Sequence, residues 1–144
     1  MASEVVVLDD RLLIEELLIG FPMRDVELHT TTSWYYRACR AAVLGAGGHL
    51  SGPLVQLGPS EQEQAILSLL ELREDVSLPD PRLTVPAMAR LASRHPTLNW
   101  LNLEAVAVGR LLAAVLWLSS GSARGILPDV LDAEGVAWRA VSVP

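Results

Sequence analysis

The sequence predicts an α/β fold with three layers, in which helices cover both faces of a mostly parallel sheet of four or five strands. Two observations support this prediction. Short apolar segments alternate along the chain with longer segments of helical periodicity, an order typical of parallel sheets whose strands are joined by helices. The first predicted strand, residues 4–8, is apolar on both sides from Val5 to Leu8, as expected for a strand that is buried on both faces.

Each predicted element rests on its own pattern. The strands are short apolar or alternating segments: 4–8, 26–31, 76–79, 115–119 and 136–143. The helices have apolar residues at intervals of three or four: 11–19, 33–44, 60–73, 85–95, 101–113 and 128–135. Apolar and polar residues alternate along the last strand, which favours a place at the edge of the sheet.

Cap and breaker residues set the limits of these elements. Asp9 or Asp10 caps the first helix, and a capping box of Ser60 with Glu63 starts the third. Residues 45–59, with five glycines and two prolines, are expected to form a loop, and GSARG at 121–125 a turn.

Length and composition indicate one domain over residues 1–144. Hydrophobic residues make up 51% of the chain and the net charge is −6. The apolar surplus favours a second subunit or another protein partner, and the acidic balance argues against general affinity for nucleic acid. No apolar run reaches the roughly 20 residues of a membrane span. The single cysteine, Cys39, fits a reducing cytoplasm.

Three segments together resemble the PIN-like domains, metal-dependent ribonucleases that include many bacterial toxins of toxin–antitoxin pairs. They are VVVLDDRLLIEELL at the start, LNLEAVAVGRLLAAVLWLSS, and ILPDVLDAEGVAWRAVSV at the end. The resemblance covers nearly the full chain in order and length. A second candidate fold is another small flavodoxin-like or Rossmann-like domain.

The resemblance implies three or four carboxylates that hold Mg²⁺ or Mn²⁺ at the carboxyl ends of the strands. The first acid falls on Asp9, which is present. The second falls near Tyr35, Tyr36 or Arg37, where the chain has no carboxylate. The third falls on Asn102, and the fourth on Ser120 or a residue close to it.

One carboxylate and an amide make a poor Mg²⁺ site, because this ion is held through charged oxygens and gives up its water reluctantly. Arg37 or Arg40 in the same cleft would repel a cation further. We therefore expect a PIN-like domain that has lost its metal and its nuclease activity, and that binds a protein, another copy of itself, or RNA. The alternative is a metal-dependent ribonuclease of the toxin type, with an atypical site of Asp9, Asn102 and Glu104.

Each candidate residue also has an ordinary structural interpretation. Asp9 and Asp10 suit the start of a helix without any further role. Glu104 fits as an ordinary glutamate in the first turns of its helix. The histidines His29, His49 and His95 share no metal-ligand spacing, and Cys39 fits as a small core residue.

The segment SWYYRACR, residues 33–40, is the most distinctive remaining feature. It gathers Trp34, Tyr35, Arg37 and Arg40 within one helix. Aromatic and arginine side chains are enriched at protein interfaces and also hold single-stranded nucleic acid. A helix with a buried aromatic side and exposed arginines explains the same composition, so all three interpretations stay open.

Overall fold

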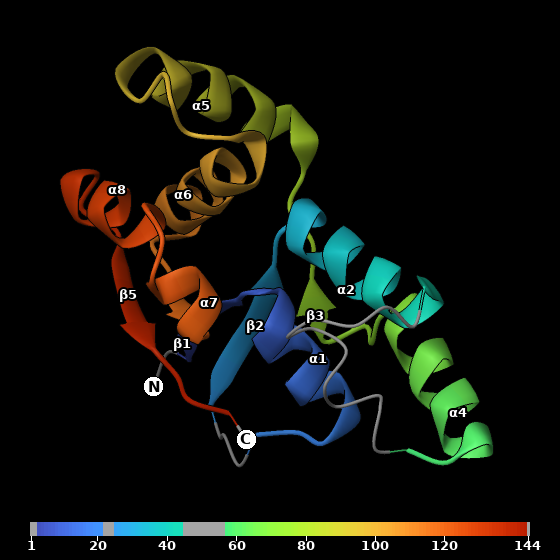
Figure 1. Ribbon diagram of the computed structural model, residues 1–144. Coiled ribbons are helices and arrows are strands. Elements are labelled where there is room, and N and C mark those ends of the chain that lie inside the picture. The colour runs from blue at the N-terminus through green and yellow to red at the C-terminus, as the bar shows by residue number, and fades with distance from the viewer. Residues whose placement is uncertain (1–2, 22–24, 45–56, 144) are drawn as a thin grey trace.

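A computed structural model describes residues 3–21, 25–44 and 57–143 and contains a five-stranded sheet in which every neighbouring pair is parallel (Figure 1). The strand order is β3-β2-β1-β4-β5, so the first strand lies in the middle and the last at an edge. The strands are β1 (Glu4–Leu8), β2 (Val26–Thr30), β3 (Val76–Ser77), β4 (Val115–Leu118) and β5 (Ala137–Ala140). The predicted α/β class, the parallel sheet and the edge position of the last strand are confirmed.

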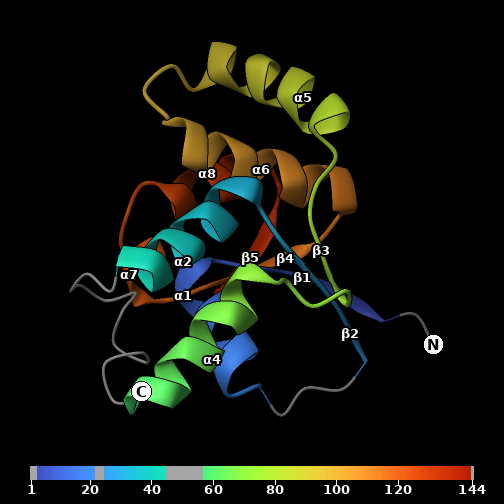
Figure 2. The same cartoon turned by 90° about the vertical axis from the view of Figure 1, so that its right-hand side faces the viewer.

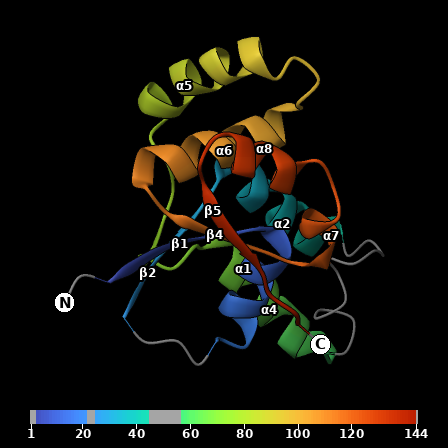
Figure 3. The same cartoon turned by 90° about the vertical axis from the view of Figure 1, so that its left-hand side faces the viewer.

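Helices cover both faces of this sheet (Figures 2 and 3). On one face lie α6 (Trp100–Leu112) and α8 (Leu127–Ala133), with α5 (Pro81–Arg94) packed outside α6. On the other face lie α1 (Asp10–Leu18) and α4 (Pro59–Leu70). The helix α2 (Thr32–Leu44) contributes to both cores, and α7 (Ser120–Ala123) is a single turn after β4.

The alternation of side chains along β1 divides the core into two. Val7 packs with α6 and α8, whereas Val6 and Leu8 pack with α1 and α4, and all three are fully buried. This is the arrangement expected of a central parallel strand. Burying apolar residues on both faces of the middle strand holds the carboxyl end of β1 in a fixed position.

The helix α6 approaches the sheet closely at Gly109. A Cβ added there would lie 2.6 Å from Val136 Cγ1 and 2.7 Å from Leu116 Cδ1. Glycine therefore lets the α6 backbone sit against β4 and the start of β5 without displacing either side chain. None of the described helices is both long and apolar enough to cross a membrane.

Several predicted limits were wrong, and each has a local reason. Ser60 and Glu63 form no capping box, because Gly58 is the N-cap of α4 and makes no side-chain cap bond. The helix predicted from 85 starts earlier, since Asp80 accepts a hydrogen bond from the Arg82 N–H and Pro81 fits the first turn. Residues 121–123 of the predicted turn belong to α7, which starts at Ser120. The predicted loop at 45–59 lies mostly outside the described residues.

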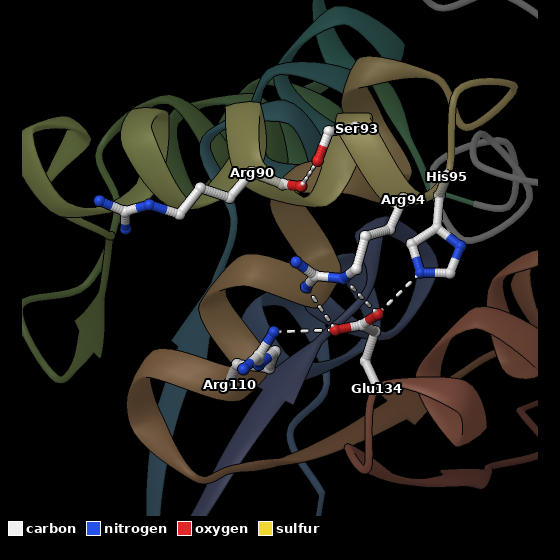
Figure 4. Close-up of polar contacts among 6 residues, drawn as sticks. All are labelled: Arg90, Ser93, Arg94, His95, Arg110 and Glu134. Carbon is white, nitrogen blue, oxygen red and sulfur yellow. Dashed lines mark hydrogen bonds and ion pairs between the residues drawn. The ribbon is translucent and has the colours of Figure 1, made fainter.

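Glu134 at the end of α8 ties the outer helix α5 to the body of the protein (Figure 4). Its carboxylate accepts hydrogen bonds from Arg94 at 2.7 and 3.2 Å, from Arg110 of α6 at 2.8 Å, and contacts His95 Nε2 at 2.8 Å. The Glu134 side chain is only 10% exposed. The hydrogen bonds from Arg94, and then His95, lower the pKa of Glu134 to about 2 from its ordinary 4.5.

This cluster makes the stability of the protein depend on pH in the acid range. Because the folded pKa of Glu134 is depressed, its contribution is complete above pH 4.5 and is lost as the pH falls toward 2. We expect Glu134→Gln to be less stable than the wild type near neutral pH, with the difference vanishing near pH 2. Urea unfolding between pH 2 and 7 measures this, with the exposed Glu74→Gln as a control that should follow the wild type. A difference that stays constant down to pH 2 would contradict the assignment.

Candidate functional site

The carboxyl ends of three neighbouring strands bring polar side chains together. Asp9 follows β1, Thr31 follows β2 and Ser119 follows β4. The three strands are in register here, since Leu8 pairs with Thr30 on one side and with Trp117 on the other. In open parallel sheets, ligands generally bind at this edge.

Asp9 lies at the centre of this edge and is fully buried. Its Oδ1 accepts a hydrogen bond of 2.9 Å from the Leu12 N–H, which makes Asp9 the N-cap of α1. Its Oδ2 accepts three more, from the Ser119 N–H at 2.8 Å, the Ser119 hydroxyl at 2.6 Å and the Ser122 hydroxyl at 2.7 Å. Asp9 therefore joins the start of α1 to the end of β4 and to α7.

A pocket of about 240 Å³ opens beside Asp9 at the same edge of the sheet. Asp10 is the acidic residue among those that line it, and Arg37 of α2 is the basic one. The remaining lining residues are neutral: Trp34, Asn99, Leu101, Asn102, Gly121, Ser122, Gly125, Ile126 and Leu127. The pocket thus has an apolar wall, several amide and hydroxyl groups, and one pair of opposite charges.

Asp10 and Arg37, the two charged residues of the pocket, neutralise each other. Arg37 Nε lies 3.0 Å from Asp10 Oδ2, and the Asp10 Oδ1 accepts a hydrogen bond from the Arg11 N–H. The Asp10 side chain is 5% exposed, whereas that of Arg37 is 43% exposed. The guanidinium of Arg37 therefore sits next to this carboxylate and remains partly open to solvent.

Glu104 caps a helix other than its own. It lies on α6 and is 4% exposed. Its Oε1 accepts a hydrogen bond from the Ser33 N–H at 2.8 Å and its Oε2 from the Thr32 N–H at 3.0 Å. A carboxylate at this place stabilises α2 through its free N–H groups and its positive end. Thr31 completes the cap by accepting from the Trp34 N–H.

The segment SWYYRACR has a buried side and an exposed side. Trp34 is 1% exposed and lies in the core, with part of its side chain against the pocket. The Tyr35 hydroxyl donates to the Leu70 carbonyl of α4 at 3.1 Å. Burial raises the pKa of Tyr35 to about 12, and the neighbouring Cys39 adds to the rise. Arg40 is exposed and does not line the pocket.

Of the two remaining predicted site residues, Asn102 and Ser120, only Asn102 lies at the pocket. Asn102 lines the pocket near the start of α6, where the third acid was expected. Ser120 is exposed, and it is Ser119 and Ser122 that contact Asp9. Ser119 and Ser122 are not among the predicted site residues, although the run SSGS directly after an apolar strand is a signal that could have found them.

The donor set described here does not suit a divalent cation. Asp9 has no exposed surface and already accepts four hydrogen bonds, and Glu104 is committed to the start of α2. Asp10 is paired with a guanidinium. Within residues 3–21, 25–44 and 57–143, no three His, Cys, Asp or Glu side chains are grouped so that they could hold a metal ion. A bound Mg²⁺ would require these carboxylates to exchange their present partners for the ion.

Comparison with known proteins supports the fold. No protein-family model matches the chain, and no curated protein matches its sequence. Among solved structures, the chain is similar to VapBC-1 from nontypeable Haemophilus influenzae, with a TM-score of 0.56 and 14% sequence identity. The match covers 94% of this chain and 97% of that chain. Together with the five-stranded parallel sheet, this likeness is consistent with a PIN-like fold.

Proposed function

We propose that this protein is a PIN-like module that has lost metal-dependent nuclease activity and works by binding another macromolecule, with a protein as the first candidate and RNA as the second. The structural neighbour VapBC-1 is a toxin–antitoxin complex, which supports a protein partner. The net charge of −6 also favours a protein over RNA.

The observation that carries this proposal is that the carboxylates at the strand ends are already bonded to groups of the protein. Asp9 is held by four donors from the protein itself, and Arg37 supplies positive charge beside Asp10. Metal-dependent hydrolysis needs a cation that activates water and stabilises charge on the phosphate. Arg37 can neutralise a carboxylate, but a guanidinium cannot supply activated water.

The pocket suits the recognition of one group of a partner. About 240 Å³ is below the usual 300–1,000 Å³ of small-molecule sites. An apolar wall that includes Trp34, beside the amides of Asn99 and Asn102, can hold one side chain or one base in a fixed orientation. Arg37, which also lines the pocket and is partly exposed, adds a charged donor of a residue type enriched at binding hot spots.

Two arginines of α2 provide a matched test. Arg37 lines the pocket, whereas Arg40, one turn further along the same exposed side, does not. We expect Arg37→Gln to weaken partner binding at least tenfold, since an interface hot spot contributes about 2 kcal/mol or more. Arg40→Gln should change it less than threefold. The wild type and the two variants are each tested for two kinds of binding. One is the retention of a protein from the source cell, and the other is the binding of single-stranded RNA of mixed sequence.

The outcomes separate the candidates. Retention of one protein by the wild type and Arg40→Gln, but not by Arg37→Gln, supports a protein-binding pocket. RNA binding with the same dependence, without cleavage in Mn²⁺, supports the second candidate. Metal-dependent cleavage of RNA by the wild type would overturn the proposal and restore the ribonuclease with an atypical site.

A further inference from the structure

The outer faces of α4 and α5 carry opposite charges in the same pattern. On α5, Arg82 and Arg90 are eight residues apart with Pro86 between them, and all three are exposed. Positions four residues apart follow one side of a helix. Figure 4 shows the Arg90 side chain extending away from the Glu134 cluster, so this arginine is not part of that network.

The exposed side of α4 has the matching negative row. Glu63 and Glu71, the C-cap residue, are also eight residues apart, with Leu67 between them, and all three are exposed. At a rise of 1.5 Å per residue, the two charges of each row are about 12 Å apart along the helix axis. The two rows therefore agree in spacing and differ in sign.

Neither row is neutralised within the described part of the chain. None of the ion pairs found among the described residues involves Arg82, Arg90, Glu63 or Glu71. The nearest acid to Arg82 along the chain is Asp80, which caps the start of α5. In all three views, α5 and α4 lie at opposite ends of the molecule (Figures 1, 2 and 3). The two rows of one molecule therefore cannot meet each other.

Exposed apolar side chains accompany the charges on both helices. Leu83 is 60% and Val85 57% exposed on α5, and Leu67 is 55% and Leu70 44% exposed on α4. Apolar groups next to complementary charges are the usual composition of a contact between proteins. The α4 face and the α5 face thus each have an apolar part and a charged part, and both parts are complementary to those of the other face.

We propose that the α5 face of one molecule docks on the α4 face of a second copy of this chain, with Arg82 and Arg90 opposite Glu63 and Glu71. Because the two faces differ, the contact is heterologous, and two molecules joined by it keep one free α4 face and one free α5 face between them. Such a contact joins molecules head to tail, into a ring if the rotation closes and into an open chain if it does not. A nucleic acid bound to α5 fits less well. Beyond Arg82 and Arg90, its phosphates would meet a protein with a net negative charge.

The affinity of this contact is expected to fall as the salt concentration rises. The Debye length falls from about 10 Å at 0.1 M salt to about 3 Å at 1 M, which screens exposed charge pairs. Self-association should therefore be strongest in low salt and weaken at least tenfold by 1 M. None of the pocket-lining residues belongs to α4 or α5, so the pocket and this contact can be tested separately.

Charge reversal provides a test in which the net charge is controlled. The variant R82E/R90E reverses the α5 row, and E63R/E71R reverses the α4 row. Combining all four substitutions gives a protein with the same composition and net charge as the wild type, but with both rows exchanged. All substituted residues are exposed, so circular dichroism should show that every variant folds.

Sedimentation equilibrium up to about 1 mM protein in low salt detects contacts with dissociation constants in the millimolar range. We expect the wild type to associate, each double variant to be at least tenfold weaker, and the fourfold variant to recover. An equimolar mixture of the two double variants should also associate, because an intact α5 face then meets an intact α4 face. A monomeric wild type, association that neither double variant weakens, or a fourfold variant that stays monomeric would each overturn the proposal.

Discussion

Asp9→Asn is expected to lower the free energy of unfolding by about 2–4 kcal/mol. The asparagine side chain keeps one acceptor oxygen and replaces the other with a donor. That donor would face the Ser119 N–H and the hydroxyls of Ser119 and Ser122, which now share Asp9 Oδ2. The negative charge at the start of α1 is lost as well. Chemical unfolding of the wild type and the variant in metal-free buffer measures the difference.

The sign of this effect separates a structural aspartate from a metal ligand. Acids that are clustered to hold a cation repel one another when the metal is absent, so removing one charge would leave the metal-free protein as stable or more stable. Asp129→Asn is the matched control, because Asp129 is exposed in the first turn of α8. Its effect should stay within about 1 kcal/mol. An Asp9→Asn protein that is more stable than the wild type would contradict the role given to Asp9.

Glu104→Gln is expected to cost about 1.5–3 kcal/mol and to loosen the first turn of α2. Glutamine can accept from only one of the two N–H groups, those of Thr32 and Ser33, that Glu104 now satisfies. The buried amide group that replaces the second oxygen would face a donor. Hydrogen exchange should show faster exchange at the start of α2, together with a lower midpoint of unfolding.

The control for this variant is Glu61→Gln, because Glu61 is an exposed glutamate in the first turn of α4. Its effect should be a few tenths of a kcal/mol, as for exposed charges near a helix start. If Glu104→Gln left the stability and the exchange of α2 unchanged, Glu104 would not be the cap that holds this helix.

Patterns along the chain predict the fold because its causes are local. The apolar run in β1 has no polar side, which predicts a strand covered on both faces; the structure places this strand in the middle of the sheet. Asp9 follows the strand and precedes the helical pattern, which predicts its cap bond to α1. The alternation of strands and helices then allows few arrangements other than the parallel sheet observed.

The site could not be predicted in the same way, because its bonds join residues far apart in sequence. Ser119 and Ser122 reach Asp9 across 110 and 113 positions, and Glu104 caps α2 across more than 70. The absence of the second, third and fourth acids at the positions that the resemblance implies is visible in the sequence. What replaces them, a serine pair around Asp9 and an arginine beside Asp10, depends on how β4, α2 and α6 pack together.

We propose that Asp9 is a structural acceptor and that no catalytic metal binds at this site. Calorimetric titration of Mn²⁺ into the purified protein tests it most directly, with Asp9→Asn and Asp10→Asn alongside. We expect no saturable heat in any of the three proteins. Saturable binding by the wild type that Asp9→Asn or Asp10→Asn abolishes, in a variant that circular dichroism shows to be folded, would contradict it.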